Sequence, residues 1–284
     1  MKTALVLEGG AMRGIYSAGV LDIFIENQIK FDAVIGVSAG ALFGANYLSE
    51  QAGRVLRYCK RFNPDRNYMG IRPLLKEGNI VSTEYAYHLV PEKLDVFDDE
   101  KFRQSEIPFT AVVTDIESGK PEYIRIRSVF DQMDILRASG SMPFVSKPVC
   151  VDGKKYLDGA VTDSIPYEYM LARGYDHIVA VLTKPEGYVK KPVSPLMADL
   201  CYRWRYPELS YRIRKRHEMY NAQMKKLEEL AADGTAEIIR RKQEISISKL
   251  ERNPEKLQLL YDAGRSDAAA WLKEKNEGAY RRHS

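Results

Sequence analysis

Short apolar runs alternate along the first fifty residues with longer segments in which apolar positions recur at helical spacing. Residues 4–8 (ALVLE) and 33–37 (AVIGV) are typical of short buried strands. Each run is followed by small residues and then by a segment of helical periodicity, RGIYSAGVLDIFIEN in the first case and ALFGANYL in the second. Strand, tight turn and helix repeated in this order predict parallel strands joined by right-handed crossovers.

The rest of the chain continues the pattern less regularly. Residues 51–105 are expected to hold helices and loops, and we predict a strand pair at 108–116 and 121–127. Further strands are predicted in a hairpin at 148–160, which turns at Asp152-Gly153, and then at 177–184 and in AEIIRR (236–241). Helices are predicted at 129–138, between Pro166 and Gly174, at 207–233, and as a final pair within 254–274.

These elements predict an α/β fold, with a central, mostly parallel sheet flanked by helices in three layers and a helix-rich C-terminal region. The chain has 284 residues, which is ample for a sizeable core. The apolar run at its N-terminus is too short for a signal peptide, and no apolar run in the sequence is long enough for a transmembrane helix. Three separated cysteines without a C-x-x-C pair are typical of reduced thiols, so we expect a cytoplasmic protein.

A serine between two glycines stands at the second strand-to-helix junction, in Gly36-Val37-Ser38-Ala39-Gly40. A nucleophilic serine needs exposure, a proton acceptor and donors for an oxyanion. A sharp turn between a strand and a helix exposes the side chain beside backbone N–H groups, and glycines remove the side chains that would clash there. Ser38 is therefore a candidate nucleophile in a G-x-S-x-G elbow, the alternative being that it only caps the following helix.

The first junction, EGGAMRG at residues 8–14, allows three interpretations. Gly9 and Gly14 fit the outer positions of a dinucleotide-binding G-x-G-x-x-G loop, but Ala11 occupies the middle position. Asp32, about 20 residues further on, precedes the second strand instead of following it, which does not suit a ribose-binding acid. A second interpretation is a purely structural turn, and the third is an oxyanion hole.

The oxyanion-hole interpretation follows from where the two junctions lie. The carboxyl ends of neighbouring parallel strands, here at Glu8 and Val37, meet at one edge of a sheet. The backbone N–H groups of Gly10, Ala11 and Met12 would then face Ser38. We therefore favour this third interpretation.

An aspartate is a better candidate for the base than any histidine. Asp158, in YLDGAVTDSIP, comes directly before Gly159 and Ala160 at the end of the predicted hairpin. Burial makes a carboxylate more basic, so it can accept the serine proton itself; the alternative is an ordinary turn aspartate. The four histidines have no such context, and we expect surface or edge positions for His88, His177, His217 and His283.

These three motifs in this order resemble those of the patatin-like phospholipase family, with GGAMRG, GVSAG and DGA as its Gly-rich loop, elbow and Asp motif. RASGSMPFVSKP (137–148) is similar to the family's loop before the Asp motif, and the resemblance is densest over the first 172 residues. It implies a catalytic core at 4–172, with 173–284 completing the α/β domain and adding basic helices. It also implies a Ser38–Asp158 dyad and oxyanion donors at Gly10, Ala11 and Met12. The supporting motif positions are Gly9, Arg13, Gly14, Gly36, Gly40, Gly159 and Ala160.

The activity implied by the resemblance is hydrolysis of lipid acyl esters, as by a phospholipase A or lysophospholipase, through an acyl-enzyme. No metal or other cofactor is implied.

Two residues depart from the family's pattern: Ala11 replaces the third glycine of the loop, and Glu8 stands where many members have Asp. We expect Glu8 to anchor the loop and Arg13 to brace the turn or a nearby acid. Two other function classes remain as alternatives: a Ser-His-Asp esterase of the α/β-hydrolase type, and an inactive regulatory protein of the same fold.

Charge is unevenly spread. Residues 1–183 carry 21 Lys and Arg against 24 Asp and Glu, whereas residues 184–284 carry 22 against 15. Residues 201–227 interleave aromatic with basic side chains, which allows peripheral contact with an anionic membrane surface. The alternative, which we prefer, is a helix packed on the core with its basic side chains in water. Nucleic-acid binding is not expected, because no recognisable binding motif accompanies these charges.

Overall fold

A mixed eight-stranded sheet forms the centre of the molecule, whose computed structural model describes residues 1–242 and 244–282. The strand order is β5-β6-β3-β2-β1-β7-β8, and β4 pairs with β3. β1, β2, β3, β7 and β8 are parallel, whereas β4 and β6 run antiparallel to β3, as does β5 to β6. The strands are β1 (Thr3–Leu7), β2 (Ala33–Val37), β3 (Phe109–Asp115), β4 (Lys120–Ile126), β5 (Val149–Val151), β6 (Lys154–Asp158), β7 (His177–Val181) and β8 (Ala236–Ile239).

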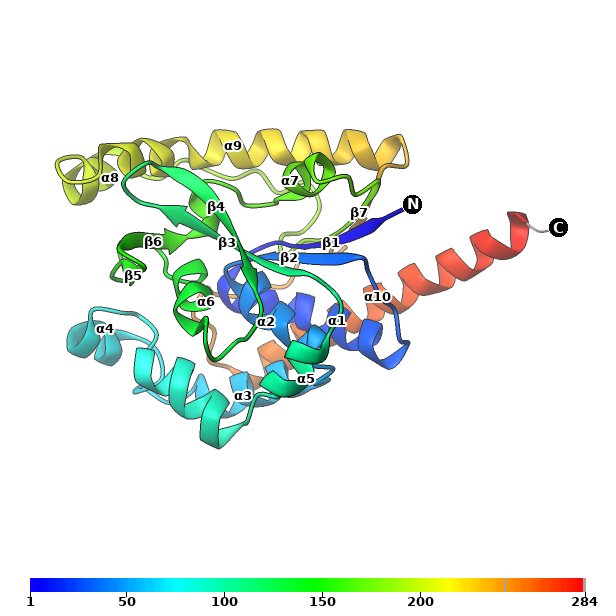
Figure 1. Ribbon diagram of the computed structural model, residues 1–284, viewed down its shortest axis with the longest axis horizontal. Coiled ribbons are helices and arrows are strands. Elements are labelled where there is room, and N and C mark those ends of the chain that lie inside the picture. The colour runs from blue at the N-terminus through cyan, green and yellow to red at the C-terminus, as the bar shows by residue number, and fades with distance from the viewer. Residues whose placement is uncertain (243, 283–284) are drawn as a thin grey trace.

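Helices cover both faces of the sheet, so the predicted three-layer α/β fold is confirmed. Figure 1 shows α7 and α9 above the sheet, and α1, α2, α6 and α10 below it, with α3 and α5 further out. The α-helices are α1 (Ile15–Glu26), α2 (Ala39–Leu48), α3 (Arg54–Phe62), α4 (Ile71–Glu77), α5 (Asp99–Gln104), α6 (Met133–Ser139), α7 (Tyr167–Ala172), α8 (Pro195–Tyr202), α9 (Pro207–Ala232) and α10 (Pro254–Arg282). Tighter or wider helical turns are η1 (Ala11–Gly14), η2 (Tyr85–Leu94) and η3 (Gly159–Val161).

The central strands are apolar throughout because both of their faces are covered. All five residues of β2 are buried, as are all but the first of β1. Side chains of β1 alternate between the two cores: Leu5 and Leu7 pack with α1, α2 and α10, and Ala4 and Val6 pack with α7 and α9. The predicted strands at residues 4–8 and 33–37 thus correspond to β1 and β2 within one residue.

The carboxyl ends of β2 and β6 meet beside the middle of β3. β2 pairs with the first half of β3 and reaches Val37 opposite Val112. β6 runs the other way along the second half and reaches Asp158 opposite Val113. Because Val112 and Val113 are consecutive, the chain segments that leave β2 and β6 emerge next to each other. This register brings Ser38 and Asp158 to one point from positions 120 residues apart.

The predicted final helix pair is wrong, since residues 254–282 form the single helix α10. Gly264, within this helix, lies against α1. A Cβ on Gly264 would be 2.1 Å from the carbonyl oxygen of Tyr16, and one on Gly19 would be 2.1 Å from that of Tyr261. These two glycines let α1 and α10 approach closely, so Gly264 serves the packing of the two helices.

We predict that Gly264→Ala destabilises the protein by about 1–3 kcal/mol, because the added methyl group overpacks the contact between α1 and α10. Helix propensity alone would favour alanine by about 1 kcal/mol. Urea unfolding measures the change. The control is Ser266→Ala on the exposed side of α10, which is expected to cause no loss. Unchanged or increased stability of Gly264→Ala would contradict this close packing.

Candidate active site

Ser38 occupies a strained position between β2 and α2. Its backbone has φ 55° and ψ −122°, which is unusual for a residue with a side chain. The glycines on either side permit the close approaches of the turn: a Cβ on Gly40 would be 2.3 Å from the carbonyl oxygen of Leu7, and one on Gly36 would be 2.5 Å from that of Gly40. The side chain of Ser38 makes no capping hydrogen bond to α2, so the helix-cap interpretation is wrong.

Ser38 and Asp158 form a buried pair. The Ser38 hydroxyl donates a hydrogen bond of 2.9 Å to Oδ2 of Asp158, and Oδ1 of Asp158 accepts from the backbone N–H of Ala160 at 2.9 Å. The two residues are 5% and 4% exposed. Burial raises the pKa of Asp158 above its ordinary value, while the positive charge of Arg216 opposes this rise. A carboxylate in such surroundings is a stronger proton acceptor than an aspartate in water.

Ser139, the last residue of α6, supports the elbow by linking it to β3, and the sequence analysis did not single it out. Its Oγ accepts a hydrogen bond from the Ser38 N–H at 2.9 Å and donates one to the Val112 carbonyl at 2.7 Å. The position lies within RASGSMPFVSKP, but nothing local in that segment marks one of its serines over another. The role follows from the register of β2 and β3, which depends on contacts far apart in the chain.

The Gly-rich loop faces the elbow, as predicted from the parallel pairing of β1 with β2. A Cβ on Gly9 would be 2.8 Å from the Cβ of Ser38, so only glycine fits there. Ala11 adopts a positive φ of 48°, a conformation that disfavours its Cβ. Within the described residues, we find no protein acceptor for the N–H of Gly10 or Ala11. The N–H of Met12, in contrast, donates to the carbonyl oxygen of Lys249 at 3.3 Å.

Glu8 anchors this loop to β7 and α9. Its carboxylate accepts hydrogen bonds from the backbone N–H of Thr183 at 2.6 Å and from the hydroxyl of Tyr220 at 3.0 Å. The Thr183 hydroxyl lies 3.0 Å from both Glu8 Oε2 and the Gly9 carbonyl oxygen. The expected anchoring role of Glu8 is therefore confirmed. Arg13, expected to brace the turn or an acid, makes no ion pair with a described carboxylate and lines a cavity beside Ser38.

The structure does not support a dinucleotide-binding loop. Asp32 precedes β2, and its Oδ2 accepts a hydrogen bond of 2.6 Å from the N–H of Thr3 at the start of β1. It therefore lies at the amino end of the parallel strands, whereas the Gly-rich loop lies at their carboxyl end. No carboxylate takes the ribose-binding position after β2, because the elbow with Ser38 is there.

Two cavities meet at Ser38. One, of about 130 Å³, has mostly apolar walls, and its lining includes Met12, Leu42, Phe43, Tyr58, Val90, Phe97, Met133 and Leu136. The other, of about 190 Å³, has polar walls, and its lining includes Glu8, Arg13, Asp158, Lys184, Lys190, Arg216 and Lys249. Ala11, Ser38, Met142 and Lys249 border both. The nucleophile candidate thus lies between an apolar and a charged compartment.

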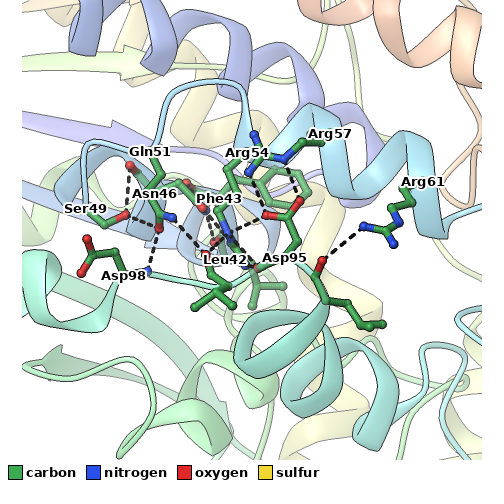
Figure 2. A network of polar contacts seen from close by, with 12 residues as sticks. Leu42, Phe43, Asn46, Ser49, Gln51, Arg54, Arg57, Arg61, Asp95 and Asp98 are labelled. Atoms are coloured by element: carbon green, nitrogen blue, oxygen red, sulfur yellow. Dashed lines mark hydrogen bonds and ion pairs between the residues drawn. The ribbon is translucent and has the colours of Figure 1, made fainter.

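An ionic network centred on the buried carboxylate of Asp95 braces the wall of the apolar cavity (Figure 2). Arg54 and Arg57 of α3 both point to Asp95, with N–O distances of 3.2 and 2.8 Å. Arg54 also donates to Oδ1 of Asn46 on α2 at 2.9 Å. Burial lowers the pKa of Arg54, but Asp95 favours its charged form. The network ties α2 and α3 to the segment after η2, and so fixes the walls between which an apolar chain would lie.

None of the three described histidines hydrogen-bonds to Ser38 or Asp158. His88 is exposed and lies 3.2 Å from Glu92, as expected for a surface residue. The expected surface or edge position is wrong for His177, which is buried at the start of β7 between two neighbouring strands. His217 lines the polar cavity, but its Nδ1 lies 2.9 Å from the Arg214 carbonyl oxygen. His283 lies outside the described residues.

The described residues contain neither a metal-binding cluster nor a membrane-spanning helix. In residues 1–242 and 244–282, no group of three or more His, Cys, Asp or Glu side chains is arranged to hold a metal ion. Across the same residues, every helix is too short or too polar to span a bilayer. The free cysteines are Cys59, which is buried, and Cys150 and Cys201, which are exposed.

Comparison with known proteins gives two family matches. Residues 5–171 match the model of the patatin-like phospholipase family, and residues 206–277 match a domain of unknown function, DUF6363. The chain is similar to the uncharacterized protein YjjU of Escherichia coli, with 29% identity over 67% of this chain and 54% of that protein. It is also similar to lysophospholipase nte1 of Aspergillus fumigatus, with 30% identity over 62% of this chain but only 12% of that protein.

A third relative is the "putative patatin-like phospholipase domain-containing protein M110.7" of Caenorhabditis elegans. It is 27% identical to this chain over 62% of this chain and 16% of its own length. The chain thus spans about half or less of the length of these curated relatives. Among solved structures, VipD of Legionella pneumophila aligns over 96% of this chain and 67% of its own, with a TM-score of 0.45 and 13% identity.

Because burial raises the pKa of Asp158, keeping this carboxylate charged costs stability at neutral pH. We predict that Asp158→Asn raises the thermal midpoint at pH 7 by about 2 °C or more, since the amide keeps both hydrogen bonds without the charge. The advantage should shrink as the pH falls toward 4, because Asp158 itself then becomes protonated. Asp131→Asn, at an exposed position, is the control and should change little. A lower midpoint for Asp158→Asn at pH 7 would contradict this account.

Proposed function

The chain belongs to the patatin-like phospholipase family, and from this premise we propose that it hydrolyses lipid carboxylic esters with Ser38 as nucleophile and Asp158 as base. The observation that supports this most directly is the 2.9 Å hydrogen bond between the two side chains, next to backbone N–H groups that have no acceptor among the described residues. The pair lies where an apolar cavity meets a polar one, as an ester with an apolar acyl chain requires.

The reaction begins with transfer of the hydroxyl proton. Asp158 accepts the proton from Ser38 as Oγ attacks the ester carbonyl carbon, and the carbonyl oxygen becomes an oxyanion. The N–H groups of Gly10 and Ala11 donate hydrogen bonds to this oxyanion. Met12 is the weaker candidate for a third donor, because its N–H is bound to Lys249.

The acyl-enzyme forms when the tetrahedral intermediate collapses. Asp158 returns the proton to the departing alcohol oxygen, and the acyl group stays on Ser38. Water then attacks the acyl carbon while Asp158 takes one of its protons. Release of the fatty acid restores the Ser38 hydroxyl, whose proton comes back from Asp158. No histidine takes part in this sequence.

The two alternative functions make different predictions about labelling. A fluorophosphonate reacts with an activated serine, and we expect Ser38→Ala to abolish labelling completely. Asp158→Asn should slow labelling by about 100-fold or more, since the base is lost. His217→Ala should retain most of it, even though His217 lines the polar cavity.

Two outcomes of the labelling experiment would favour the alternative functions. Loss of labelling in His217→Ala to the level of Asp158→Asn would favour a Ser-His-Asp esterase. Absence of Ser38-dependent labelling in the wild type would favour an inactive regulatory protein. His88→Ala serves as the control substitution, because the His88 side chain is 41% exposed and lines neither cavity.

We also propose that a short apolar surface on α8 and the turn after it docks the protein on an anionic membrane. In α9 the apolar side chains Leu209, Ile213, Tyr220 and Leu227 are buried, so this helix packs on the core as preferred from the sequence. Just before it, Leu196 and Leu200 of α8 are 78% and 80% exposed and Trp204 is 96% exposed. Arg203 and Arg205 flank the tryptophan, the combination typical of an interfacial segment.

Leu200→Ser combined with Trp204→Ser is predicted to weaken binding to anionic vesicles by about tenfold or more, since two large apolar side chains no longer enter the lipid. Co-sedimentation with vesicles of phosphatidylglycerol and phosphatidylcholine measures the change. Leu259→Ser, at an exposed apolar position of α10, is the control and should bind like the wild type. Equal binding by the double variant and the wild type would refute this docking surface.

A further inference from the structure

The polar cavity beside Ser38 carries an excess of positive charge. Six cationic side chains line it against two carboxylates, those of Glu8 and Asp158; the cations are Arg13, Lys184, Lys190, Lys191, Arg216 and Lys249. Both carboxylates are engaged by neutral donors, Glu8 by Thr183 and Tyr220 and Asp158 by Ser38 and Ala160. None of the six cations forms an ion pair with a carboxylate among the described residues, whereas their neighbours Arg214 and Lys215 on α9 do.

Several of these cations are also removed from water. Lys184 is only 9% exposed, and Nε of Arg216 is buried without a hydrogen-bond partner among the described atoms. Burial, followed by repulsion from the neighbouring cations, lowers the pKa of Lys190 to about 7. Burial lowers that of Lys184 to about 8. Charges that are buried and unpaired destabilise a folded chain, so a bound anion would relieve a real cost here.

The cluster is held by the fold and is drawn from separate parts of the chain. Arg13 belongs to η1, Lys184 follows β7, and Arg216 lies in α9. The backbone of Lys190 is fixed by two hydrogen bonds with the side chain of Asn221, of 2.9 and 3.1 Å. Lys249 is fixed through its carbonyl oxygen, which accepts from Met12. The tertiary structure therefore brings these cations, from separate segments of the chain, to the same cavity.

We propose that this cavity binds a phosphate monoester, so that the lipid hydrolysed at Ser38 is an acyl ester whose alcohol part carries a terminal, dianionic phosphate. The inference rests on the proposed hydrolase function and names its substrate class. With the acyl chain in the apolar cavity and the phosphate among the cations, the ester carbonyl lies at Ser38, which borders both. Water is added across the ester bond, which yields a fatty acid and a phosphorylated alcohol.

Head groups that carry a positive charge fit the same cavity poorly. A choline group is commonly held against aromatic faces, and Tyr188 and Tyr220 do line the cavity. Those faces are already occupied, because Nζ of Lys190 lies 4.5 Å from the Tyr220 ring centroid and that of Lys184 lies 5.6 Å from the Tyr188 centroid. A second cation there would meet the lysine charges, whereas a phosphate monoester presents about two negative charges to them.

The test compares three substrates with the same acyl chain below their critical micelle concentrations: 1-acylglycerol 3-phosphate, 1-acylglycerophosphocholine and 1-acylglycerol. We expect kcat/KM for the phosphate ester to exceed that for the choline ester by about tenfold or more. Arg216→Met and Lys190→Met should each lower the ratio of phosphate ester to neutral ester by about tenfold. Both substrates react through the same Ser38 and Asp158, so the ratio cancels any effect that a variant has on Asp158. Arg212→Met, one turn away on the exposed face of α9, is the control and should keep the wild-type ratio.

Inorganic phosphate and glycerol 3-phosphate separate a lipid head group from free phosphate. Both should inhibit hydrolysis of 1-acylglycerol by the wild type, but with inhibition constants well above the KM of the phosphate lipid. This arm also decides the proposal if the Arg216 and Lys190 variants fail to fold. Equal hydrolysis of the phosphate and choline esters, an unchanged ratio in folded variants, or no inhibition by either anion would overturn it. Loss of all Ser38-dependent hydrolysis would instead refute the proposed function.

A pH profile provides a second readout. As pH rises, Lys190 and then Lys184 lose their positive charge near pH 7 and 8. The profile of kcat/KM reports the free enzyme, so the value for the phosphate ester should begin to fall near pH 7 and continue to fall through pH 8, while that for 1-acylglycerol does not. The titratable groups that line the cavity with these lysines are Glu8, Arg13, Asp158, Lys191, Arg216, His217 and Lys249. Parallel profiles for the two substrates would contradict the proposal.

Discussion

The meeting of β2 and β6 beside one strand is the constraint on which the candidate site depends. β3 pairs with β2 as far as Val112 and with β6 from Val113, so the ends of the two strands face each other across a single residue step. Backbone hydrogen bonds of the sheet thus fix the distance between Ser38 and Asp158. Ser139 adds to this by linking the Ser38 N–H to the Val112 carbonyl. The pair is set before any substrate arrives, which is how an enzyme gains from pre-organisation.

The same sheet edge separates two environments around that pair. Helices below the sheet supply an apolar cavity, while α9 and the segments after β7 and β8 supply a charged one. Residues 206–277, which match a domain of unknown function, contribute Arg216 and Lys249 to the charged side. The C-terminal region therefore completes the candidate site. Burial affects both kinds of charged group at this site. It raises the pKa of Asp158, and it lowers the pKa of Lys190 by disfavouring its positive charge.

Local sequence signals predicted the parts of the fold and site that depend on neighbours in the chain. β1, β2, the hairpin at Asp152-Gly153 and the elbow at Ser38 each have a turn or periodicity signal of their own. Ser139, Lys190 and Arg216 had none, because their roles arise from strand register and from helices that meet only in the folded chain. The predictions for His177 and for a helix pair within residues 254–274 were wrong for the same reason, since the buried strand and the continuous helix depend on partners far away in sequence.

The proposed reaction requires that an acyl group is carried on Ser38. Rapid mixing of the wild type with 1-acylglycerol 3-phosphate, an acid quench within milliseconds and peptide mapping by mass spectrometry measure this directly. The account predicts a peptide containing Ser38 that is heavier by the acyl group and that disappears as substrate is exhausted. Hydrolysis that proceeds at the full rate without acylated Ser38, or with the acyl group on another residue, would contradict it.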